Sequence, residues 1–106
     1  MGLDQRIAFG PSRLMPGWPE FTQRLTGRGI HFQLRMIDGE LALPDESPPD
    51  DWRELRLSTA RGMITLHRET DGLRLVIWGN ADPGLLAERD ALAAAIAEMT
   101  QGTLQT

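Results

Sequence analysis

His67 and Glu54 are the two residues whose types and spacing best suit acid–base chemistry. Each lies in a segment of alternating apolar and polar residues, 53–59 and 63–69, and a four-residue connection can join these segments as a hairpin. The register that pairs the apolar residues of the two segments also places His67 opposite Glu54. A carboxylate that orients a histidine is one arrangement of a general base. The alternative is an ordinary cross-strand surface pair, and because no nucleophile converges on His67 we assign no catalytic residue.

The acidic residues of segment 44–51 offer oxygen atoms that a hard cation such as calcium could bind. Their spacing matches no EF-hand loop, and three prolines restrict how the carboxylates can converge. We therefore predict an exposed, acidic, proline-rich loop and no metal site. The acidic residues are Asp45, Glu46, Asp50 and Asp51.

Other motifs for catalysis or cofactor binding are missing from the sequence. It has no phosphate-binding glycine loop, no zinc-protease or serine-hydrolase motif, and no cysteine. The turn 79–84 leads into a helix N-terminus, which can hold a phosphate, but Asp82 occupies that position itself. We expect His31 to be structural. We also expect no cofactor.

Apolar residues on a sheet face that should meet water suggest an interaction surface. Alternation after an Asp71–Gly72 turn places Val76 and Trp78 on that face, at the level of Met63. Tryptophan and methionine are enriched where proteins contact proteins. We therefore predict an interface formed by Met63, Val76 and Trp78, with Trp52 as a further candidate.

The same face has an alternative explanation within the chain. The N-terminal segment carries Phe9, Leu14, Met15 and Trp18, which could fold over this face and remove it from solvent. The first hypothesis predicts a partner or a second copy of the chain, and the second predicts an internal contact.

Two turn signals organise the strands that must position these residues. Asp38–Gly39 and Asp71–Gly72 each separate two alternating segments, which is typical of hairpins with two-residue loops. We expect the side chains of Met36 and Leu41 to face the core. The predicted pairs are Met36 with Leu41, Leu34 with Leu43, and Glu69 with Arg74.

Two helices flank these strands in the sequence. One is predicted over about residues 19–26, and the other begins after the capping residue Asp82 and ends at Gly102. The 106-residue chain is therefore predicted to be a single α+β domain, with N- and C-terminal helices on one face of a five-stranded antiparallel sheet. Residues 1–17 are interpreted as a flexible tail, in which segment 7–9 could form a short edge strand.

Composition narrows the class of protein. Hydrophobic residues make up 41% and charged residues 25% of the chain, as in ordinary globular domains. No apolar run reaches the roughly 18 residues of a membrane span, and the N-terminus does not resemble a signal peptide, so we expect a cytoplasmic protein with no membrane contact. Fifteen acids against eleven arginines give a net charge of −4, which disfavours a nucleic-acid partner.

Because no catalytic constellation is present, we expect a small non-enzymatic protein-interaction module, chaperone-, adaptor- or immunity-like. It would bind an unidentified protein, or form a homodimer, through the outer face of the sheet. The alternative is a small-ligand binder or enzyme that uses His67 and Glu54. A polar cavity beside His67 would favour the alternative, and a flat apolar sheet face would favour the module.

Overall fold

The computed structural model describes residues 4–10, 15–77 and 82–105. In chain order its elements are β1 (Asp4–Ala8), α1 (Trp18–Gly27), β2 (Gln33–Ile37), β3 (Glu40–Leu41), β4 (Glu54–Ser58), β5 (Met63–Glu69), β6 (Gly72–Val76), α2 (Pro83–Thr100) and β7 (Thr103–Gln105). The strands pair antiparallel in one sheet, in the order β3-β2-β4-β5-β6-β1-β7. The predicted α+β class with an antiparallel sheet is confirmed.

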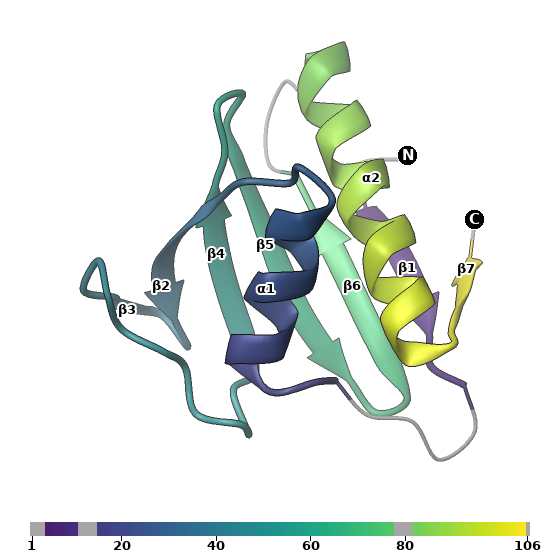
Figure 1. Ribbon diagram of the computed structural model, residues 1–106, viewed down its shortest axis with the longest axis horizontal. Coiled ribbons are helices and arrows are strands. Elements are labelled where there is room, and N and C mark those ends of the chain that lie inside the picture. The colour runs from purple at the N-terminus through teal and green to yellow at the C-terminus, as the bar shows by residue number, and fades with distance from the viewer. Residues whose placement is uncertain (1–3, 11–14, 78–81, 106) are drawn as a thin grey trace.

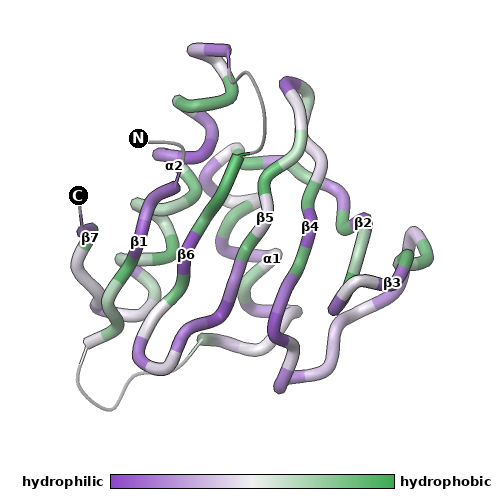
Figure 2. The backbone as a smooth tube through the Cα atoms, turned by 180° about the vertical axis from the view of Figure 1, so that it is seen from behind, coloured by the Kyte–Doolittle hydropathy of each residue, from purple (hydrophilic) through white to green (hydrophobic). Residues whose placement is uncertain are grey.

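Both helices lie on the same face of the sheet (Figure 1). The core lies between them and the sheet, where alternate residues of β4, β5 and β6 are at most 1% exposed. These residues are Leu55, Leu57, Ile64, Leu66, Leu73 and Leu75. Seen from behind, the opposite face carries no helix, and we call it the outer face (Figure 2). Neither described helix combines the length and the apolar character that a membrane span requires.

The predicted count of five strands is wrong, because a short strand precedes α1 and another follows α2. Neither helix is therefore the terminal element. β1 lies between β6 and β7, so residues 4–8 of the predicted flexible tail belong to the sheet. Only Ile7 of β1 is fully buried, and all three residues of β7 are exposed. Neither strand therefore has the apolar alternation by which the other strands were predicted.

The β5–β6 hairpin differs from the predicted register by two residues. Glu69 lies opposite Gly72 and not opposite Arg74, so residues 70–71 form the connection. Gly72 belongs to β6, where an added Cβ atom would lie 2.1 Å from the carbonyl oxygen of Ile7. This glycine allows the close approach of β1 and is not part of the turn. Because side chains alternate with a period of two, the shift leaves each side chain on its predicted face.

The first hairpin has the predicted turn. Asp38 and Gly39 have φ angles of 50° and 85°, which suit a two-residue loop. Met36 lies opposite Leu41 as predicted. β3 ends at Leu41, so the second predicted pair of this hairpin is absent from the ladder.

A β-bulge overturns the predicted orientation of Met36. The register between β2 and β4 shifts between Leu34 and Met36, which places Met36 opposite Arg56 on the outer face. Leu34 keeps its core position and is 6% exposed. The extra residue that a bulge inserts reverses the alternation beyond it, so Met36 and Leu41 point away from the core.

Asp82 begins α2 as predicted. Its side-chain oxygen Oδ1 accepts a 3.0 Å hydrogen bond from the backbone N–H of Leu85, and Pro83 follows at the first helical position. The helix ends at Thr100, and the capping residue Gln101 that follows has a φ of 51°, in the left-handed region. Gly102 then turns the chain into β7.

We expect Asp82→Ala to lower the free energy of unfolding by about 0.5–2 kcal/mol, because it removes the cap of α2. Urea denaturation measures this loss. Asp82→Asn keeps an acceptor oxygen at the same place and is expected to retain most of the stability. Equal losses in both variants would contradict the capping role.

Candidate functional site

His67 and Glu54 form the predicted cross-strand pair on the outer face. They lie opposite each other on β5 and β4, and His67 Nδ1 is 3.4 Å from Glu54 Oε1. The side chains are 24% and 36% exposed. The other ring nitrogen, Nε2, is buried and has no hydrogen-bond partner in the described part of the chain. On the other side, the neighbour of His67 is Arg74 on β6, so a cation flanks the pair.

Charges on the part of the outer face formed by β1, β6 and the end of β5 neutralise one another. The guanidinium of Arg74 lies 3.7 Å from Asp4 and 3.5 Å from Glu69. Arg6 lies 3.9 Å from Glu69. Such partly exposed pairs contribute little to stability. Two arginines against two acids leave this part of the face without excess charge.

The part formed by β2 and β4 carries two arginines that lack an acidic partner within the described ranges. Arg35 Nε donates a 2.9 Å hydrogen bond to the hydroxyl of Ser58. Arg56 Nε is buried and has no hydrogen-bond partner among the described residues. Glu54 shares this face of β4 with Arg56, but its carboxylate contacts His67. Since arginine is always protonated in proteins, this part of the face keeps an excess of positive charge.

Apolar side chains surround these two arginines. Met36 lies opposite Arg56, and Leu41 lies opposite Met36 at the sheet edge. Met63 lies on the other side, opposite Ser58. Leu41 is 84% exposed and Met63 is 38% exposed. We call the set formed by Arg35, Arg56, Met36, Leu41 and Met63 the Arg35/Arg56 surface.

Two of the three predicted interface residues that the structure describes are buried. Met63 is exposed on the outer face, but Val76 is only 7% exposed and lies opposite the buried Thr65. Trp52 is 4% exposed and belongs to the core. Trp78 lies outside the described residues. Of the three candidates that the structure describes, Met63 alone therefore has an exposed side chain.

The N-terminal segment was the alternative explanation for the apolar outer face, and its described apolar residues pack against the core. Phe9, Met15 and Trp18 pack against the core cluster. Trp18 also stacks on Phe21 of α1 at a ring distance of 5.4 Å. Leu14 lies outside the described residues.

The charges of the acidic loop favour the protonated form of Arg68, at the edge of the core. The guanidinium of Arg68 lies 4.3 Å from the centre of the Trp52 ring, a cation–π arrangement. Burial lowers the pKa of Arg68, and the charges of Asp50, Asp51 and Asp38 oppose that shift. Two of the loop's four acids therefore stabilise a cation of the same chain.

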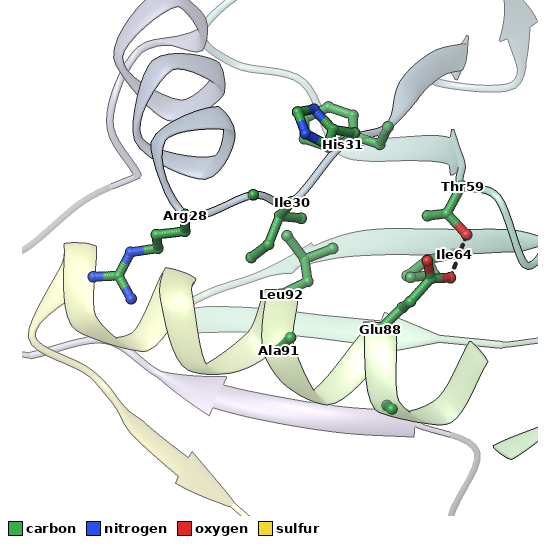
Figure 3. Close-up of a pocket in the computed structure, with 11 residues that line it drawn as sticks. Arg28, Ile30, His31, Thr59, Ile64, Glu88, Ala91 and Leu92 are labelled. Atoms are coloured by element: carbon green, nitrogen blue, oxygen red, sulfur yellow. Dashed lines mark hydrogen bonds between the residues drawn. The ribbon is translucent and has the colours of Figure 1, made fainter. Parts of the chain in front are cut away.

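A groove of about 340 Å³ lies between the end of α1, the segment that leads into β2, and α2. Its interior is apolar: Ile30 and Leu92 point toward each other across it, and Ile64 lies at its base (Figure 3). His31 and Arg28 line its rim. Arg28 forms an ion pair with Glu98.

Glu88 is the acidic residue of this groove. It points from α2 toward Thr59, whose hydroxyl donates a 2.5 Å hydrogen bond to Glu88 Oε1 (Figure 3). The Thr59 oxygen in turn accepts hydrogen bonds from the backbone N–H groups of Arg61 and Gly62. The β4–β5 turn therefore holds the carboxylate in place.

No protein-family model, curated protein or solved structure matches the chain. A function can therefore be proposed only from the geometry described above. Sequence analysis missed both the Arg35/Arg56 surface and the groove. A bulge, which has no signature in apolar alternation, creates the first. The groove is formed by segments that are far apart in the sequence. The one local feature that could have indicated it is the position of Glu88 four residues before Leu92, on the same helix face.

Proposed function

We propose that the protein is a small interaction module whose Arg35/Arg56 surface binds a carboxylate-bearing segment of another protein. The observation that carries this proposal is that Arg35 and Arg56 have no acidic partner among the described residues, although they lie on one exposed part of the sheet. A carboxylate docked on this part of the outer face would neutralise both guanidinium groups.

The residues of this surface indicate which kind of partner segment it would bind. The planar guanidinium group binds a carboxylate through two parallel hydrogen bonds, so Arg35 and Arg56 suit aspartate or glutamate side chains. Met36, Leu41 and Met63 would contact apolar residues beside those acids, because methionine adapts its shape to different partners. The partner segment is therefore acidic and carries apolar side chains next to its carboxylates.

In this proposal His67 and Glu54 affect the charge of the Arg35/Arg56 surface. Their mutual contact keeps Glu54 from neutralising Arg56, although both residues lie on the same face of β4. In this proposal the pair acts by maintaining the charge of the surface.

Selection from a displayed peptide library tests the proposal. We expect the selected peptides to be enriched in Asp and Glu next to apolar residues. Arg35→Gln/Arg56→Gln should weaken their binding by about tenfold or more, because each hydrogen bond to a charged group contributes roughly 1.5–3 kcal/mol. Binding should also weaken as salt is raised.

The matched control removes the same two charges elsewhere. Arg24 on α1 and Arg61 in the β4–β5 turn are both exposed. Arg24→Gln/Arg61→Gln changes the net charge equally and should leave binding unchanged. Equal weakening in both double variants would indicate an effect of net charge alone and would contradict a defined surface. Preferential capture of single-stranded nucleic acid by the Arg35/Arg56 surface would also overturn the proposal.

A further inference from the structure

We infer that the groove between α1 and α2 binds a small organic ammonium ion with an apolar body. This inference is independent of the Arg35/Arg56 surface, which lies on the other face of the sheet. It rests on the charge of Glu88, which lines the groove together with apolar side chains and the ion-paired Arg28.

The charges around the groove are unequal at its two ends. Arg28 at one end is neutralised by its ion pair with Glu98. Glu88 at the other end has no ion pair with a cation of the described residues. Among the residues that line the groove, no unpaired arginine would compensate for this carboxylate if the ligand were an anion. A cationic ligand would complete the charge balance, so the groove favours a cation.

The geometry of Glu88 leaves one carboxylate oxygen for a ligand. The Thr59 hydroxyl binds Oε1, and the described residues provide no hydrogen bond to Oε2. A carboxylate has about four lone-pair sites, so it can accept further bonds from an ammonium group. Since Thr59 already fixes the side chain, little rotamer entropy is lost when the ligand binds.

The other residues that line the groove indicate what kind of ligand body it could hold. Ile64 and Leu92 are at most 2% exposed, and they form an apolar base with Ile30 and Phe32 beside it. The volume of about 340 Å³ is at the small end of the range for ligand sites, roughly 300–1,000 Å³. The site therefore suits a compact aliphatic or aromatic amine, with its ammonium group at Glu88 and its body over Leu92.

Three probes that share a phenylethyl body test the inference: 2-phenylethylamine, which is cationic at neutral pH, 2-phenylethanol and 3-phenylpropanoate. Their binding is measured by NMR titration of the labelled protein. We expect the amine to bind about tenfold more tightly than the alcohol, because hydrogen bonds to charged groups are stronger. The anion should bind most weakly. The shifted signals should come from Ile30, Ile64 and Leu92.

Glu88→Gln keeps an acceptor for Thr59 and removes the charge, so it should abolish the preference for the amine over the alcohol. Asp90→Asn, on the same helix but outside the groove lining and 58% exposed, is the matched control and should keep the preference. Arg35→Gln/Arg56→Gln should leave amine binding unchanged, which separates this test from that of the proposed function. The inference is overturned if the anion binds as well as the amine, if Glu88→Gln keeps the preference, or if the amine causes no shifts up to its solubility limit.

Discussion

Replacement of Leu66 by alanine is expected to lower the free energy of unfolding by about 2–5 kcal/mol, the range for large-to-small changes in a packed core. Leu66 is fully buried in β5, between Leu55 of β4 and Leu75 of β6. The rigid strands on both sides limit how far the cavity can collapse. Ile96, fully buried on α2, should show a loss in the same range when it is replaced by alanine.

Leu41→Ala is the matched control, because the same atoms are removed from a side chain that is 84% exposed. Its effect should stay within about 0.5 kcal/mol. Chemical denaturation of the three variants measures all of these values. If Leu66→Ala were as mild as Leu41→Ala, the assignment of the buried face would be wrong. Leu41→Ala should instead weaken peptide binding at the Arg35/Arg56 surface.

Gly72→Ala is expected to detach β1 and to cost about 1–3 kcal/mol or more, as overpacking does. The new Cβ atom would lie 2.1 Å from the backbone oxygen of Ile7, and backbone cannot rotate away as a side chain does. Separation of β1 would also expose Ile7, which is 2% exposed, and would remove the strand that β7 pairs with.

Hydrogen exchange gives a local measurement of this effect. The backbone N–H of Phe9 donates a 2.8 Å hydrogen bond to the carbonyl of Asp71, and this amide should lose protection in Gly72→Ala. Gly27→Ala is the control, because its added Cβ atom would meet no atom within 4 Å. Unchanged protection of Phe9 in Gly72→Ala would show that the close approach of β1 does not depend on the glycine.

The central strands could be predicted because turn chemistry and apolar alternation act locally. The β4–β5 register and the His67–Glu54 pair followed from the apolar pattern of segments 53–59 and 63–69. The Asp71–Gly72 turn was assigned wrongly, since a glycine that permits close packing of a third strand has the same identity as a turn glycine. Local sequence does not distinguish these two uses.

The candidate site was less predictable than the fold for a physical reason. The excess charge at Arg35 and Arg56 depends on which arginines find carboxylates across the sheet, and this requires the full strand order. Arg74 finds Asp4 only because β1 pairs with β6, a contact between residues far apart in sequence. The surroundings of Trp52 likewise include a residue from another strand, because the guanidinium of Arg68 on β5 lies over its ring.

The most direct measurement of the central claim is an NMR titration of the labelled protein with an acidic peptide from the library selection. We predict that the largest shifts come from the backbone amides of β2 and β4 and from the guanidinium Nε–H of Arg56, and that Arg35→Gln/Arg56→Gln removes them. Shifts confined to the helices, or shifts that persist in the double variant, would contradict binding at the Arg35/Arg56 surface.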